Sequence, residues 1–178
     1  MNPELAVQLV LVLLGATAVA SVAGWAPYGR GIWPPIALVL LGVTAVLAAV
    51  PDQIDASDRR VAVLVVALAG TLAVFGGGPL TTWVFAFVDR AQPEADSMEH
   101  AGTVLRGGAW IGALERLAVF AGLAAGFPEG VAVVLALKGV GRFPELRGGG
   151  TTERFIIGTF TSVLWAAAAA GIVALTLR

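Results

Sequence analysis

Cysteine is absent from the sequence, and histidine occurs once, as His100. Without cysteine the chain cannot form disulfides, thiolate metal sites or a cysteine nucleophile. With one histidine it cannot supply a two-histidine metal or haem site. Paired catalytic aspartates are not evident either. We therefore expect no metal and no cofactor, and we predict that the protein is not an enzyme.

Charged residues are also scarce, at 13% of 178 residues, and the mean hydropathy is +0.88. Soluble domains carry about 25% charged residues, so this chain has too few to cover a surface that faces water. The net charge is −1, and no basic run is present, so nucleic acid is not an expected partner. The composition predicts a single all-α membrane domain over residues 1–178, with membrane lipids as its surroundings.

Apolar stretches predict about six transmembrane helices, since about 20 apolar residues cross a hydrocarbon core of roughly 30 Å. The predicted spans are residues 5–24, 33–50, 61–75, 107–126, 131–143 and 155–177. The sequence Gly76-Gly77-Gly78-Pro79 is expected to end the third span near Phe75, because glycine and proline are poor helix formers. Residues 80–88 are then predicted to form a helix in the membrane interface, or alternatively a re-entrant half-helix.

Basic residues are distributed unequally between the two predicted sides of the membrane. One side holds Arg30, Arg90, Arg106, Lys138, Arg142, Arg147 and Arg154, whereas the other holds Arg59, Arg60 and Arg178. Cytoplasmic loops of membrane proteins are enriched in Lys and Arg. We therefore predict a multi-pass protein of the cell membrane, specifically a bacterial inner membrane, with loop 144–153 in the cytoplasm. Both termini are then outside, unless residues 80–88 cross back and reverse the N-terminal half.

The strongest candidate for a site is Glu115-Arg116, which lies inside the fourth predicted span. A charge at the centre of a membrane helix costs at least about 2.5–3.5 kcal/mol, so such residues usually face a bundle interior and pair. Adjacent helix residues point about 100° apart, so each of these two needs its own partner. Arg116 is expected to reach the cytoplasmic interface or an acid elsewhere.

Lys138 is the expected partner of Glu115. The short turn at Pro128-Glu129 makes the fourth and fifth spans antiparallel neighbours, and the two residues lie at similar distances from it. Arg142, one turn beyond Lys138, is a second candidate. The pair could be a structural ion pair that fixes helix register, or a substrate or proton site.

Two further patterns lie on the last three spans. Gly108, Gly112, Gly122 and Gly126 are spaced by four within each pair, which favours close helix packing. Thr159, Thr161 and Ser162 in the last span, and Arg154 directly before it, are further candidates for polar contacts. Hydroxyls in membrane helices usually bond their own backbone or a neighbouring helix.

From Gly107 on, the sequence resembles a family of bacterial integral-membrane proteins catalogued as domain of unknown function three-three-zero-seven. The shared pattern is Gly-Gly-Ala-Trp-Ile-Gly-Ala-Leu-Glu-Arg, then Lys138 with Arg-Phe-Pro-Glu-Leu from Arg142, then Glu-Arg-Phe-Ile-Ile-Gly-Thr from Glu153 to Thr159 and on to Ser162. The resemblance implies a membrane protein in which Glu115, Arg116, Lys138 and Arg142 belong to one motif. It implies no particular activity.

Two functions are compatible with these patterns. The first is a non-enzymatic accessory or scaffold module that associates with itself or with a larger membrane complex, its charges forming structural ion pairs. The alternative is a small transporter or lipid-binding protein that uses Glu115, Lys138 and Arg142 around a pocket facing the cytoplasm. Arg142, Arg147 and Arg154 would then meet anionic headgroups near the interface. A polar cavity that reaches Glu115 would favour the alternative.

Overall fold

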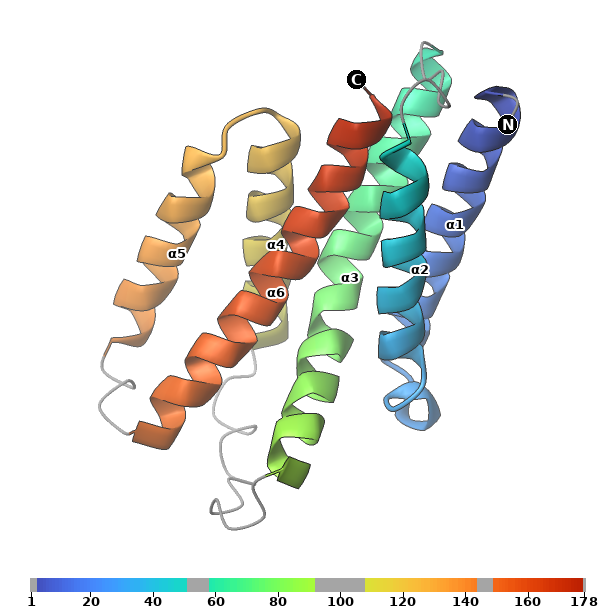
Figure 1. The fold of residues 1–178 in the computed structure, drawn as a ribbon. Coiled ribbons are helices and arrows are strands. Elements are labelled where there is room, and N and C mark those ends of the chain that lie inside the picture. Colours follow the sequence, from blue (N-terminus) through green and yellow to red (C-terminus); the bar gives the residue numbers. More distant parts are fainter. Residues whose placement is uncertain (1–2, 51–57, 92–107, 144–148, 178) are drawn as a thin grey trace.

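In a computed structural model, the described residues (3–50, 58–91, 108–143 and 149–177) form six α-helices and a short 3-10 turn, with no strand among them. The elements are α1 (Pro3–Ala23), η1 (Pro27–Gly29), α2 (Trp33–Ala48), α3 (Arg59–Ala91), α4 (Gly108–Ala124), α5 (Glu129–Arg142) and α6 (Gly149–Thr176). Consecutive helices run in opposite directions, and the two termini lie at the same end of the bundle (Figure 1). The all-α prediction is confirmed.

Three of these helices are long and apolar enough to cross a membrane: Glu4–Ala23, Arg59–Asp89 and Thr152–Thr176. Helix α2 is apolar but shorter, at 16 residues. Helices α4 and α5 have 17 and 14 residues. By length and composition, the structure therefore supports three spans where the sequence predicts six.

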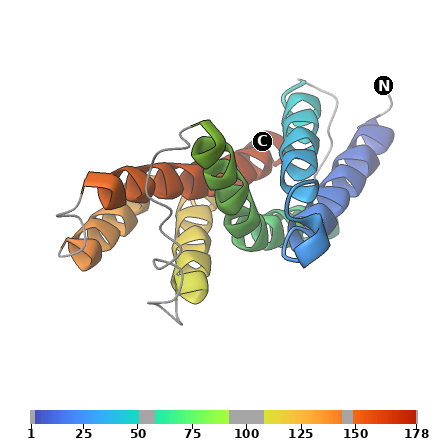
Figure 2. The ribbon, with the colours of Figure 1, turned by 90° about the horizontal axis from the view of Figure 1, so that it is seen from below.

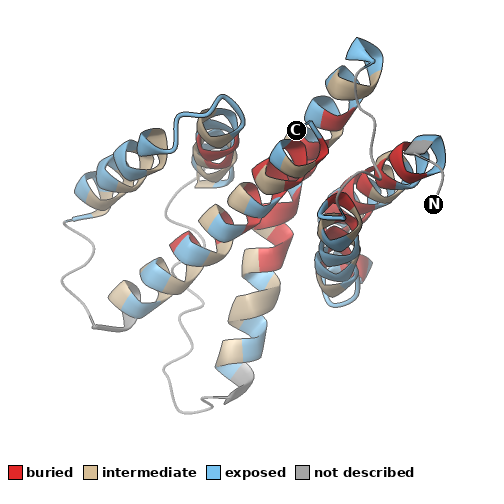
Figure 3. Cartoon of the chain, turned by 45° about the horizontal axis from the view of Figure 1, so that its top comes forward, coloured by how far each residue is buried: buried red, intermediate tan, exposed pale blue. Residues whose placement is uncertain are grey.

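Helix α3 lies at the centre of the bundle and contacts α1, α2, α4 and α6. Its buried side chains, such as Leu72, join Leu14 of α1 and Ile172 of α6 in one apolar core. Figure 3 shows the buried residues concentrated along α1, α3 and α6. By contrast, α5 has no buried residue and forms an outer layer against α4.

Helix α3 corrects the prediction of a break after Phe75. It continues through Pro79 to Ala91, so residues 80–88 belong to the same helix rather than to an interfacial or re-entrant one. The helix changes direction along its length (Figure 2), as a proline inside a helix commonly causes. Proline is tolerated in membrane helices where neighbouring helices satisfy the freed backbone groups.

Three side chains from neighbouring segments donate to carbonyls in this part of α3, and one of these carbonyls, that of Phe75, is the group that Pro79 leaves without a helical partner. Trp165 Nε1 donates to the carbonyl of Leu72, Arg116 Nε to that of Val74, and Trp25 Nε1 to that of Phe75, each at 2.8 Å. The three carbonyls lie on one turn of α3, just before Pro79. This turn of α3 is therefore hydrogen-bonded to α6, to α4 and to the turn that follows α1.

Three consecutive glycines of α3, Gly76, Gly77 and Gly78, provide space for the same three donors. A β-carbon on Gly76 would overlap the ring of Trp165, one on Gly77 would overlap Arg116 Cδ, and one on Gly78 would lie 2.8 Å from the ring of Trp25. Glycine is thus used here for close helix approach, not for helix termination. A helix-propensity argument cannot distinguish these two uses.

Candidate functional site

The short connection between α4 and α5 sets the geometry of the charged residues. Gly126 has a positive φ of 74°, its N–H donates to the carbonyl of Leu123, and the N–H of Phe127 donates to that of Gly122. This is the pattern of a Schellman motif, which ends a helix tightly with glycine in the left-handed region. Gly126 is therefore a helix cap, a role that its predicted use in helix packing does not describe.

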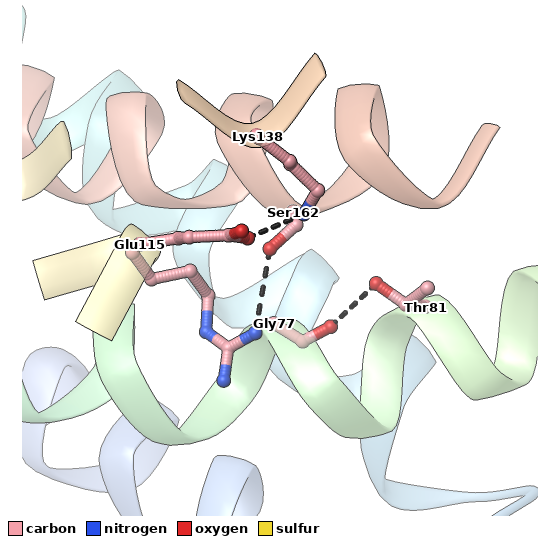
Figure 4. Close-up of polar contacts among 6 residues, drawn as sticks. Gly77, Thr81, Glu115, Lys138 and Ser162 are labelled. Atoms are coloured by element: carbon pink, nitrogen blue, oxygen red, sulfur yellow. Dashed lines mark hydrogen bonds and ion pairs between the residues drawn. The ribbon is translucent and has the colours of Figure 1, made fainter. Parts of the chain in front are cut away.

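Across this hairpin, Lys138 Nζ donates to Glu115 Oε2 in an ion pair. Figure 4 shows the two side chains directed toward each other, with Ser162 of α6 beside them. The predicted contact is thus present. The side chains of Lys138 and Glu115 keep 20% and 19% of their exposure, so the pair is neither sealed in the core nor fully at the surface.

The ion pair lines a groove of about 460 Å³ between α4 and α5. Small residues hold the groove open: Gly112 and Ala118 line it on α4, and Gly141 lines it on α5. A β-carbon on Gly141 would meet open space. The full lining is Gly108, Ile111, Gly112, Leu114, Glu115, Ala118, Val134, Leu137, Lys138, Gly141 and Arg142.

The groove combines cationic, anionic and apolar groups. Lys138 and Arg142 contribute the cations, Glu115 contributes the carboxylate, and most of the remaining lining is aliphatic. Three of the predicted site residues therefore share one cavity. Gly108 and Gly112, predicted as a packing surface, instead lie along the same groove.

Arg116 faces a different set of partners from Glu115. It is only 5% exposed and donates from Nε to the carbonyl of Val74 and from Nη1 to Ser162 Oγ at 3.3 Å. Its partners are a backbone carbonyl and a hydroxyl rather than the acid or the membrane interface expected from the sequence. Arg116 therefore links α4 to α3 and α6, outside the groove.

Arg154 is likewise separate from the groove. It pairs with Asp89 of α3 at 2.5 Å and its guanidinium lies 5.5 Å from the ring centre of Phe85. With side-chain exposures of 39% and 50%, Arg154 and Asp89 form a surface pair that connects α6 with the end of α3. Loop residues 144–148 and His100 lie outside the described residues.

The two tryptophan donors and the packing role of Gly76, Gly77 and Gly78 were not predicted from the sequence. Nothing close to Trp25 or Trp165 in the sequence indicates the carbonyl to which each donates. A usable signal was Pro79 itself, because a proline inside an apolar helix implies a donor elsewhere for the carbonyl four residues earlier.

No group of three or more His, Cys, Asp or Glu side chains that could hold a metal occurs within the described ranges. The site is thus a groove with two cations and one carboxylate, on the outer side of a helical bundle. No family model, curated protein or solved structure matches the chain.

Proposed function

We propose that this is a multi-pass, non-enzymatic membrane protein whose α4–α5 groove binds an amphipathic molecule of the membrane with a charged headgroup. All six helices then cross the bilayer, including the shorter α2, α4 and α5. The alternating helix directions and the location of both termini at one end support this arrangement. We also propose that the chain is related to the family catalogued as domain of unknown function three-three-zero-seven.

The proposed orientation follows from the end of the bundle at which the basic residues lie. The last residues of α1, α3 and α5 lie at the end of the bundle opposite the termini (Figure 1). In the sequence, most Lys and Arg residues lie close to these three helix ends, which favours the cytoplasm for this end. With α3 as one helix, six crossings would put both termini outside and residues 144–153 inside, and this is the orientation we propose.

The observation that carries the proposal is the groove itself. Charged side chains within a membrane helix are costly and usually serve a polar pathway or pocket. Here Glu115 and Lys138 line a cavity, and aliphatic residues such as Leu137 and Ile111 line its walls. A ligand with a charged head and an apolar tail would match both parts of this lining.

The test is the lipid that remains on the protein after purification in mild detergent, measured by native mass spectrometry. Gly141→Phe fills the groove, whereas Gly139→Phe introduces the same ring two residues away, outside the groove lining and also in open space. Retention should fall at least about tenfold in Gly141→Phe, equivalent to about 1.4 kcal/mol, and remain unchanged in Gly139→Phe. Equal retention in both variants would contradict the proposal.

A second candidate function is the accessory module that associates with other chains. It is favoured by the outer position of α5, where Val133, Leu137 and Val140 are all more than half exposed. In a complex these side chains would contact a partner helix rather than lipid. Crosslinking of a cysteine at Val140 to a second protein in intact membranes would favour this function, and its absence would favour the groove.

A further inference from the structure

The groove lies between two short helices, one of which, α5, is the shortest of the six described α-helices. At 1.5 Å per residue, α5 is about 21 Å long and α4 about 26 Å, against a hydrocarbon core of roughly 30 Å. Helix α3, with 33 residues, is about 50 Å long. A short hydrophobic segment thins the bilayer beside it or draws its charged side chains toward the interface.

Charged residues shorten the apolar path along the groove further. Only residues 130–137 separate Glu129 from Lys138 on α5, an apolar length of about 12 Å. On α4, Glu115 lies seven residues after Gly108 and nine before Ala124, close to the middle of the helix. The groove therefore carries polar groups from Arg142, at the end of α5, to the mid-depth of α4.

We infer that this groove takes the phosphodiester headgroup of membrane phospholipids and lets the lipids exchange between the two leaflets. The inference rests on the proposed function and adds the class of ligand and the movement. Phosphate is recognised by guanidinium and ammonium groups, which Arg142 and Lys138 provide. The acyl chains stay in the surrounding lipid, which the open side of the groove faces.

Glu115 is expected to weaken the binding of phosphate to Lys138. Its carboxylate already pairs with Lys138, so an incoming phosphate has to compete for the ammonium group and leaves readily when the ion pair re-forms. Passage along a pathway requires binding that is favourable enough to enter and weak enough to leave. From Glu115 to the cap at Gly126 the remaining distance is about 16 Å, so the headgroup crosses roughly half of the usual apolar barrier.

The same cations would also bind a free phosphate ester in water. A lipid phosphate and a free phosphate differ in how they cross the bilayer. The lipid headgroup crosses while its acyl chains stay in the bilayer, whereas the free anion passes from the water on one side to the water on the other. Three apolar residues of the groove lining, Ile111, Leu114 and Leu137, are 47–69% exposed, so the groove is open beside them, which favours the lipid.

The experiment uses the full-length protein in vesicles of phosphatidylcholine and phosphatidylglycerol that contain a trace of phosphatidylglycerol labelled on its acyl chain near the headgroup. Dithionite, which does not cross the bilayer, bleaches only outer-leaflet dye in protein-free vesicles. With the protein, inner-leaflet dye should also be bleached. The exchange rate should fall at least about tenfold in Gly141→Phe and be unchanged in Gly139→Phe, whose substitution lies outside the groove.

A second variant changes the charges without filling the groove. Glu115→Gln combined with Lys138→Met removes both members of the ion pair, and slower exchange at unchanged unfolding temperature would support the headgroup pathway. Lipid retention in detergent without any exchange in vesicles would overturn this inference and leave the proposed function intact. Equal lipid retention in Gly141→Phe and Gly139→Phe would overturn both this inference and the proposed function. Release of trapped inorganic phosphate without lipid exchange would identify a free anion and overturn the lipid inference.

Discussion

Trp25 donates its indole N–H to the carbonyl of Phe75, the group that Pro79 leaves without a helical partner. In an uninterrupted helix the N–H of residue 79 would bond the carbonyl four residues earlier, and proline has no N–H to give. The donor comes instead from a residue 50 positions away in the sequence. The turn after α1 thus stabilises the middle of α3.

Replacement of this donor is the first prediction. Trp25→Phe keeps most of the ring and removes the N–H, so the carbonyl of Phe75 loses its partner. Hydrogen bonds between membrane helices contribute about 0.6–1.7 kcal/mol, and a loss of this size is expected. It should appear as a lower unfolding temperature in detergent.

A matched second change tests the cause of that loss. Pro79→Ala restores a backbone N–H at position 79, which can bond the carbonyl of Phe75. The double variant should therefore recover part of the stability that Trp25→Phe loses, giving a coupling free energy between the two positions. Strictly additive effects would show that Trp25 stabilises the protein by packing alone.

The second prediction concerns the contact between Gly77 and Arg116. A β-carbon at position 77 would overlap Arg116 Cδ, and the guanidinium is fixed by bonds to Val74 and Ser162. Gly77→Ala should therefore destabilise the protein by about 1–3 kcal/mol, as overpacking does. The control is Gly171→Ala in α6, where the added methyl meets open space and should stabilise the helix by about 0.5–1 kcal/mol. Equal effects on thermal unfolding would refute the close approach.

Features that depend on residues close together in the sequence were predictable, whereas features that depend on distant residues were not. The predicted spans agree with the helices to within a few residues at most ends, because apolar length and turn residues act locally. The Glu115–Lys138 contact was predictable because a short turn fixes two antiparallel helices. Nothing local indicated the partner of Arg116, since a backbone carbonyl carries no residue type that a sequence pattern could reveal.

The continuity of α3 was not predictable from helix propensity. The propensities of glycine and proline describe helices in water, where an unpaired carbonyl is solvated and the helix can end. In this bundle three donors, from α4, from α6 and from the turn after α1, meet the turn before Pro79, and Gly76, Gly77 and Gly78 allow their close approach. These contacts join segments up to 93 positions apart, which periodicity does not detect.

The third prediction is the orientation. The protein has no native cysteine, so single cysteines report unambiguously. Gly149→Cys, at the start of α6, should react with impermeant maleimides only after cells are opened, whereas Arg59→Cys, at the start of α3, should react in intact cells. The physical reason is the excess of basic residues at the end that holds the first position. Labelling of Gly149→Cys in intact cells would show that the orientation is the reverse of the predicted one, and the groove would then not face the cytoplasm.

The fourth prediction distinguishes a structural ion pair from a binding site. Glu115→Ala leaves Lys138 without its partner, and breaking a buried pair typically costs about 3–5 kcal/mol. With about a fifth of each side chain exposed, the loss here should be smaller, and it should show as reduced yield and a lower unfolding temperature. Glu115→Gln with Lys138→Met removes both charges and should be close to wild type in stability. If the ion pair only fixes helix register, this double variant should keep its lipid retention, because the groove keeps its shape.

If the ion pair takes part in binding, the double variant should be stable and retain less lipid. Stability as low as that of Glu115→Ala would show that the two charges contribute to folding beyond their mutual pairing, and the pair would then be part of the bundle rather than of the site.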